Sequence, residues 1–374
     1  MLPLRSTRTL CHSASEPILL RLKSETDPDT LFHLFQSNAT NRLLVENRFA
    51  FRDTVTRLAA ARRFDHIHSL LHHQTTLPQA RREGFLVRII SLYGLAGMTD
   101  HALRTFHHAR GPRTVKSFNA ALKVLALSPK LDSILEFLSL VPPLYNIQLD
   151  VFSINIAIKA FCDLGKLQEA YLFMVDSENK GISPDAITFT TLISAFYKSK
   201  SCEIGNGLWN RMVLKGCMPT LATFNVRIQF LVNNRRAWDA NKLMDLMQKL
   251  GVEPDEVTFN LVIKGFCVAS YLDMAKRVYS ALHGKGCKPN AKIYQTMIHY
   301  LCKSRDFDLA YTMCKDSMTK NWFPDVYTIC MLLEGLKGSD QIAKAIVIMT
   351  LVRKRIPPFA SEYLASMQSI LSRS

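Results

Sequence analysis

Cysteine and histidine, the side chains that most often bind metals, occur here without the spacing of a metal site. The chain has 9 cysteines, and no two of them form a Cys-x-x-Cys pair. Several cysteines are instead separated by multiples of 35 residues, as are Cys162, Cys267 and Cys302. The 11 histidines also lack metal-ligand spacing. We therefore predict no metal site and no small disulfide-bonded scaffold, and we interpret the cysteines as buried hydrophobic residues of a repeat.

The short motifs of common enzyme classes are missing from the sequence. No Gly-x-Gly-x-x-Gly loop, no Gly-x-x-x-x-Gly-Lys-Ser/Thr loop and no Gly-x-Ser-x-Gly turn occurs. Acidic residues do not cluster as a two-metal nuclease would require. We predict that the protein is not an enzyme, uses no cofactor and has no small-molecule substrate.

Composition and charge favour a soluble protein with an acidic partner. The chain of 374 residues is 48% hydrophobic and 21% charged, which is typical of a folded protein. Its 47 Lys and Arg against 31 Asp and Glu give a formal net charge of +16. The most apolar run, Ile342 to Val352, is interrupted by Lys344 and is shorter than the ~18 residues of a spanning helix. No membrane insertion is expected.

Proline and glycine mark a repeat of 35 residues. Each proline of one series follows the previous one by that distance: Pro184, Pro219, Pro254, Pro289 and Pro324. Three residues before each proline stands a residue that favours the left-handed conformation: Gly181, Gly216, Gly251, Gly286 and Asn321. Glycine or asparagine followed by proline ends a helix. The spacing therefore predicts that a helix ends in every window.

Apolar residues between these stops recur at helical spacing twice per window. In window 256–290, Val257, Leu261 and Phe266 lie on one face, and Ala275, Val278 and Leu282 form a second face. A single helix–turn–helix unit cannot bury its apolar face alone, so neighbouring units must stack. We predict an all-α fold, a right-handed superhelical solenoid of helix–turn–helix repeats of about 35 residues each.

The expected domain organisation follows from these windows. It comprises a candidate mitochondrial transit peptide at 1–15, an N-terminal linker or cap at 16–47, degenerate repeats at 48–114, a repeat array at 115–359 and a C-terminal cap at 360–374. The regular repeats of the array are 151–185, 186–220, 221–255, 256–290 and 291–325.

The first residues have the composition of an organellar transit peptide. Arg5 and Arg8 lie among hydroxyl side chains, and no acidic residue precedes Glu16. Leucines beside the arginines favour the mitochondrion, with the chloroplast as the alternative. A terminus that is merely disordered is the other interpretation.

The repeat resembles a known family. The segments Thr258–Cys267 (TFNLVIKGFC) and Lys285–Asn290 (KGCKPN) are similar to the pentatricopeptide repeat, and Val151–Asp185 resembles it equally well. The resemblance covers about 83–359 clearly and 48–82 weakly. The single length of the strong units resembles the P-type subclass. The resemblance implies a plant-type organellar protein that binds RNA.

The resemblance also implies which residues read the RNA. In the family, the fifth and last residues of each repeat read one base. The implied pairs are Asn119 with Asp150, Asn155 with Asp185, Thr190 with Thr220, Asn225 with Asp255, Asn260 with Asn290, and Gln295 with Asp325. An Asn–Asp pair resembles a uracil reader and an Asn–Asn pair a pyrimidine reader. The implied target is about six nucleotides, 5′-U-U-n-U-Y-n-3′.

Other residues of the windows are candidates for stacking and phosphate contacts. The second residues Phe152, Ile187 and Val257 suit apolar contact with a base, and a place in the core is their alternative. Lys198 and Lys303 hold the thirteenth place, which suits a phosphate contact. Helix capping alone is the alternative for the last residues of the windows. The asparagines favour base reading, because asparagine is a poor helix former and recurs on one face.

We predict sequence-selective binding of single-stranded RNA in an organelle, supporting the stability, processing or translation of a transcript. The alternative is a structural or assembly component of the mitochondrial ribosome, which the small number of clear pairs favours. A protein-binding scaffold is a third possibility, against which the net charge of +16 and the asparagine column argue.

Overall fold

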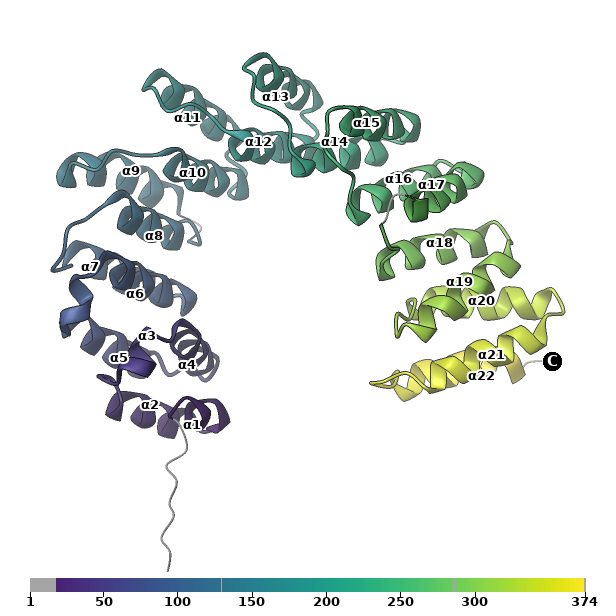
Figure 1. Cartoon of the computed structure of the whole chain (residues 1–374), viewed down its shortest axis with the longest axis horizontal. Helices are drawn as coiled ribbons and strands as arrows, with labels where there is room; N and C mark the ends of the chain where they lie inside the picture. The colour runs from purple at the N-terminus through teal and green to yellow at the C-terminus, as the bar shows by residue number, and fades with distance from the viewer. Residues whose placement is uncertain (1–17, 129, 285–286, 373–374) are drawn as a thin grey trace, which may run out of the picture. The chain divides into compact units, whose positions relative to one another are not determined.

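Helices form all the regular secondary structure of the residues that the structure describes. This computed structural model describes residues 18–128, 130–284 and 287–372. The candidate transit peptide at 1–15 and Gly286 lie outside these ranges. Within them, α-helices α1 to α22 and the short 3-10 helix η1 follow one another without a strand, as Figure 1 shows. The predicted all-α class is confirmed. None of the described helices combines the length and hydropathy that crossing a bilayer requires.

The chain divides into two compact units, residues 1–188 and 189–374. Unit 1 begins with α1 (Ile18–Ser24), α2 (Pro28–Ser37) and α3 (Arg42–Glu46). These helices pack against the first helix pair and bury Leu31, Phe35 and Leu44. Residues 18–47 therefore contribute to the core of unit 1.

Helix pairs make up the rest of unit 1. Their bounds are α4 (Arg48–Ala60) and α5 (Phe64–Thr76), then η1 (Pro78–Arg81), α6 (Glu83–Leu95) and α7 (Thr99–His107), α8 (Val115–Leu125) and α9 (Leu131–Tyr145), and α10 (Val151–Asp163) and α11 (Leu167–Asn179). The first helix of each pair packs against the first helix of the next, so that α4, α6, α8 and α10 form one row. Figure 1 shows this stacking in purple to teal.

Unit 2 repeats the same arrangement. After α12 (Ala186–Lys198), which contains the division between the units, come α13 (Cys202–Leu214), α14 (Leu221–Asn233), α15 (Ala237–Lys249), α16 (Glu256–Val268), α17 (Leu272–Gly284), α18 (Ala291–Lys303), α19 (Phe307–Thr319), α20 (Val326–Gly338), α21 (Ile342–Arg353) and α22 (Ser361–Ser372). First helices α14, α16, α18 and α20 pack in sequence. Helix α22 covers α20 and α21 at the end of the row.

A column of small residues lets the two helices of each pair approach closely. Ala170, Ala240, Ala275, Ala310 and Ala345 are all completely buried. Large side chains fill the space beside them, and Phe189, Phe224 and Phe259 from the fourth place of three windows are buried as well. The Met and aromatic residues of these columns are therefore core residues, as the apolar spacing predicts.

Left-handed backbone conformations make the turns between helices. The residues at the predicted helix stops have positive φ angles: Gly181, Gly216, Gly251 and Asn321. A second left-handed position, the fifteenth of each window, joins the two helices of a pair. It is Gly165 in one window but Lys200, Arg235, Ser270 and Arg305 in others.

Candidate nucleic-acid interface

The last residue of most windows caps the first helix of the next window. In each case a side-chain oxygen of the last residue accepts a hydrogen bond from the backbone N–H three residues later. The acceptor and donor residues are Asp150 and Ser153 (2.8 Å), Asp185 and Thr188 (2.8 Å), Asp255 and Thr258 (2.9 Å), Asn290 and Ile293 (3.1 Å), and Asp325 and Thr328 (2.7 Å). Each bond satisfies a donor that the start of a helix leaves without an intrahelical partner. These residues therefore cap helices, as the alternative interpretation of the sequence expects.

The same carboxylates bind the amide side chains at the fifth place of their own windows. The amide nitrogen donates to the carboxylate in Asn119–Asp150 (3.1 Å), Asn155–Asp185 (3.1 and 3.2 Å), Asn225–Asp255 (3.3 Å) and Gln295–Asp325 (2.8 Å). A carboxylate has about four acceptor sites, so capping and pairing are compatible. The structure thus brings together four of the six pairs that the resemblance implies.

A third residue, which the sequence analysis missed, completes each cluster. The hydroxyl group at the third place of the following window donates to the asparagine oxygen, from Ser153 to Asn119 (2.6 Å), from Thr188 to Asn155 (2.6 Å) and from Thr258 to Asn225 (2.7 Å). In the fourth cluster Gln295 Nε2 donates to the Thr328 hydroxyl (2.9 Å). The spacing Asp-x-x-Ser/Thr, which is that of a capping box, is the signal that could have revealed it.

The two remaining pairs are built differently. Thr190 and Thr220 are each bonded to the Thr223 hydroxyl, at 2.7 and 3.0 Å, so they meet through that residue. The Asn260 oxygen accepts a hydrogen bond from Thr296 at 3.1 Å, while Asn290 caps the next helix. Ile293 stands in the third place after Asn290 and has no hydroxyl group to link the pair.

Hydrogen bonding keeps the aspartates of three clusters ionised. Partial burial alone would raise the pKa of Asp185, but bonds from the Thr188 backbone and from the Asn155 and Thr188 side chains outweigh it. The pKa of Asp185 is therefore lower than usual. The pKa of Asp150 and that of Asp255 are lowered in the same way, against the opposing effect of burial. At neutral pH these carboxylates can only accept hydrogen bonds.

Second residues of the windows are exposed beside the clusters. Phe152, Ile187 and Val257 have exposed fractions of 54%, 62% and 51%, which argues against their alternative place in the core. Tyr327 holds the same place in window 326–359 and is 64% exposed, although the sequence analysis did not select it. These side chains can offer an apolar or aromatic face to a base. Asn119 is 4% exposed, whereas Asn155 and Asn225 are half-buried.

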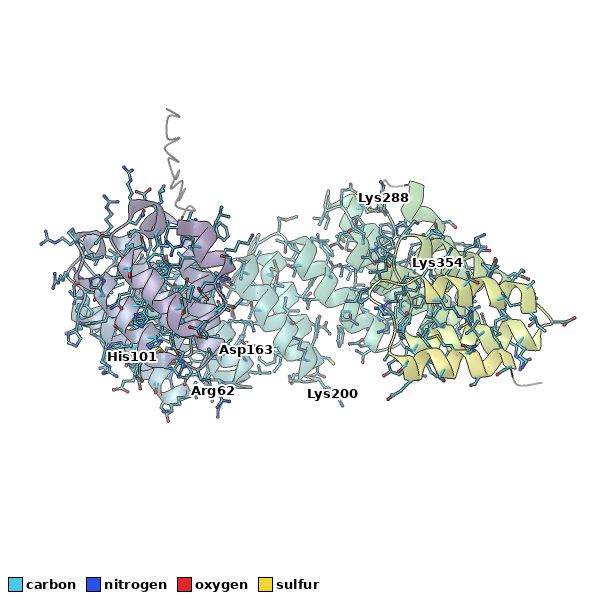
Figure 2. The ribbon with its side chains drawn as sticks, turned by 90° about the horizontal axis from the view of Figure 1, so that it is seen from below. Arg62, His101, Asp163, Lys200, Lys288 and Lys354 are labelled. Atoms are coloured by element: carbon cyan, nitrogen blue, oxygen red, sulfur yellow. The ribbon has the colours of Figure 1, made fainter. Side chains whose placement is uncertain are left out.

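A groove of about 680 Å³ in unit 2 gathers three of the expected site residues. Lys198, Asn225 and Val257 line it together. Lys200, which projects from the turn after α12 in Figure 2, adds a second cation. Phe230 lines the same groove and stacks on Tyr197, with ring centroids 3.9 Å apart. The groove therefore combines positive charge, an amide edge and apolar surface.

The last cluster of unit 2 contains a histidine. His299 Nδ1 lies 3.3 Å from the Thr328 hydroxyl, and its ring centroid lies 6.0 Å from that of Tyr327. Burial, together with the charge of Lys303, lowers the pKa of His299. Lys303 itself is exposed, with its ammonium group 5.4 Å from the centre of the Tyr300 ring.

Comparison with known proteins identifies the repeat. The models of the PPR repeat family match residues 149–198 and 219–268, and those of the PPR repeat match 187–217 and 257–287. The chain is 58% identical over 243 residues to a mitochondrial pentatricopeptide repeat-containing protein of Arabidopsis thaliana, a match covering 58% of this chain and 61% of that protein.

Two further similarities cover more of the chain. The small ribosomal subunit protein mL103 of Arabidopsis thaliana is 34% identical over 90% of this chain and 83% of its own length. The crystal structure of the maize pentatricopeptide repeat protein PPR10 matches 92% of this chain and 57% of that chain, with a TM-score of 0.53 and 16% identity. With helix pairs of the matching fold and a relative similar over most of both chains, this protein belongs to the pentatricopeptide repeat family.

Proposed function

We propose that this protein binds single-stranded RNA and reads one base per window through its amide–carboxylate pairs. The observation that carries the proposal is the groove at Asn225, where the paired amide, the exposed Val257 and Lys198 face one space. These are the groups that hold a base edge, a base face and a phosphate. The net charge of +16 supports a polyanionic partner.

The hydrogen-bond capacity left on the amides suggests which base each pair prefers. In Asn155 and Asn225 the carboxylate uses one amide donor, and the threonine hydroxyl uses one acceptor site of the amide oxygen. One N–H and one lone pair remain for a base. Uracil and cytosine both complement such an edge, but the adjacent carboxylate favours the N3–H donor of uracil over the N3 acceptor of cytosine.

The same argument gives a different base preference for the Asn260–Asn290 pair. No carboxylate stands at Asn290, so the electrostatic preference for an N–H donor is absent. We propose that this pair accepts either pyrimidine. The two pairs built around Thr190 and Gln295 remain unassigned in the target 5′-U-U-n-U-Y-n-3′.

We also propose that the protein is of the P-type, is not catalytic and acts in the mitochondrion. The strict spacing of the strong windows supports the P-type assignment. Relatives described as mitochondrial support the location. The role follows as the stabilisation, processing or translation of a transcript. Among the described residues, no group of His, Cys, Asp or Glu is disposed to hold a metal ion.

Substitution at the fifth place tests base reading. In the double variant Asn155→Thr, Asn225→Thr, the shorter side chains should shift the preference from uracil towards guanine at two matching positions. Thr190 shows that threonine fits this place with its hydroxyl bonded to Thr223, so the cost in stability should stay within about 1 kcal/mol. The measurement is binding of a short single-stranded RNA series at fixed salt.

The matched control is Asn179→Thr, which changes an exposed asparagine at the end of α11. It should leave base preference and affinity unchanged. The slope of affinity against salt should also be the same in the double variant, because no phosphate contact is removed. Unchanged base preference and affinity in the double variant would show that these asparagines do not contact RNA.

A structural role in the mitochondrial ribosome is the second candidate. The relative described as small ribosomal subunit protein mL103 favours it, because the similarity extends over most of both chains. Crosslinking in isolated mitochondria followed by sequencing of the bound RNA separates the two roles. A footprint on one messenger supports a transcript-specific factor, and a footprint on ribosomal RNA supports the ribosomal role.

A further inference from the structure

A second cavity, of about 480 Å³, lies in unit 1 between α5, α6 and α7. The windows that form it, 48–82 and 83–114, contribute none of the amide–carboxylate pairs. Its apolar part is formed by Ala80, Phe85, Leu86 and Ile89, which are buried. The volume is within the usual range for small-molecule sites, about 300–1,000 Å³. The cavity is therefore a separate candidate site.

Basic side chains gather on the polar part of this cavity. Four histidines from two helices and the turn after them meet there with two arginines: His68, His72, His101, His108, Arg104 and Arg110. The histidines come from two histidine-rich stretches that are about 30 residues apart in the sequence. The fold brings them together because α5 and α7 both lie against α6.

The imidazole groups contact one another directly. The ring centroid of His68 lies 4.5 Å from that of His101 and 5.4 Å from that of His72. The Tyr93 hydroxyl lies 3.2 Å from His68 Nδ1, and the Tyr93 ring stacks on His101 at 5.6 Å. His68 and His101, the second of which is labelled in Figure 2, therefore belong to one cluster of aromatic and basic side chains.

The electrostatics of the cluster favour an anion. Burial, followed by the charges of His101, His72 and Arg104, lowers the pKa of His68, and Asp65 opposes this effect. No Asp or Glu is among the described side chains that line the cavity. A bound anion would be attracted by the permanent charges of Arg104 and Arg110 and would favour the protonated form of His68.

We propose that this cavity binds a nucleoside 5′-phosphate, with its phosphate on Arg104, Arg110 and the histidines and its base over the apolar part. The arginines can form paired hydrogen bonds to a phosphate. The imidazole rings and the side of the cavity formed by Phe85 offer flat surfaces on which a planar base can stack. The same chemistry is offered by a free mononucleotide and by the 5′-terminal nucleotide of an RNA.

Calorimetric titration of the full chain with AMP, and with adenosine as the phosphate-free probe, tests this proposal. AMP should bind at least tenfold more tightly than adenosine. The double variant Arg104→Gln, Arg110→Gln should weaken AMP binding at least tenfold. The single variant Arg104→Gln, which keeps the Arg110 bond to the Thr76 carbonyl, should show part of that loss. The matched control Lys242→Gln, Lys249→Gln removes two exposed charges of α15 and should change nothing.

A comparison of one short RNA carrying a 5′-phosphate or a 5′-hydroxyl identifies the source. Tighter binding of the phosphorylated RNA, lost in the arginine variant, assigns the cavity to an RNA end. AMP binding without such a difference assigns it to a free nucleotide. The proposal is overturned if AMP does not bind and the 5′-phosphate has no effect, or if the arginine and lysine variants behave alike. Base preference at the amide–carboxylate pairs is measured separately and does not depend on this result.

Discussion

A single carboxylate serves two purposes at four of the boundaries between windows. Asp185 caps α12 through the Thr188 N–H and also holds the Asn155 amide. The Thr188 hydroxyl fixes the other end of that amide. The amide is therefore held in one orientation before any ligand arrives, which reduces the ordering cost of binding. Capping and the amide pairing on which the proposed base reading depends are therefore both made by the Asp185 carboxylate.

The lowered pKa values of these carboxylates predict how stability depends on pH. Asp150, Asp185 and Asp255 have lower pKa values in the folded chain than the ordinary 3.8. Their contribution to the free energy of unfolding is therefore present above about pH 4 and is lost as pH falls through the lowered folded values. Urea unfolding midpoints should therefore drop as the pH is lowered below about 4.

The triple variant Asp150→Asn, Asp185→Asn, Asp255→Asn removes the three titrations while keeping a residue type that caps well. Its unfolding midpoint should fall less steeply over the same pH range. Identical acid profiles for the native chain and the variant would contradict the assigned pKa shifts.

The resemblance to the family implies the four pairs that the structure brings together, because a strict repeat places equivalent residues in equivalent positions. The third member of each cluster was missed, since Ser153 or Thr188 in a first helical turn is unremarkable until its partner across the boundary is known. The burial of Asn119 could not be predicted either. Its residue type fits the pattern of the other asparagines, but the packing of the folded chain leaves it almost fully buried.

Left-handed turns determine how each helix pair folds back on itself. Gly165 and Arg305 occupy the same place in their windows with φ angles of 72° and 62°. A side chain is strained in this conformation, whereas glycine adopts it readily. Windows without glycine at this place therefore keep a modest local strain.

Exchanging the residue types at this place should change stability in opposite directions. Arg305→Gly should raise the free energy of unfolding by about 0.5 kcal/mol, a net of the strain relieved and the greater freedom of the unfolded chain. Gly165→Ala should lower it by about 1 kcal/mol, although the new methyl group would have open space around it. Equilibrium unfolding in urea gives both values. Equal effects of the same sign would show that the φ angle is not the cause.

A repeat pattern predicts some parts of the whole molecule and not others. Windows 151–325 could be predicted in detail because proline and glycine recur strictly. The histidine cavity of 48–114 could not, because degenerate windows do not specify which residues face one another. His68 and His101 come together only through the packing of α5 and α7 against α6.

The composition of residues 1–15 predicts the destination of the whole protein. Arginine and hydroxyl residues without an acidic residue are typical of a mitochondrial transit peptide. A fluorescent reporter fused behind these residues should accumulate in mitochondria, and a fusion with Arg5→Glu and Arg8→Glu should not. A native fusion that stays in the cytosol, or that enters only chloroplasts, would contradict the predicted address.

The central claim is that ionised aspartates make their asparagine partners prefer uracil. The double variant Asp185→Asn, Asp255→Asn removes both charges and retains residues able to cap a helix, as Asn290 does in this chain. The measurement is the affinity for one short single-stranded RNA carrying uracil or cytosine at the two matching positions. We expect the native chain to prefer uracil about fivefold or more per position, roughly 1 kcal/mol each, and the variant to bind both RNAs nearly equally. An undiminished preference for uracil in the folded variant, or no preference in the native chain, would contradict this account.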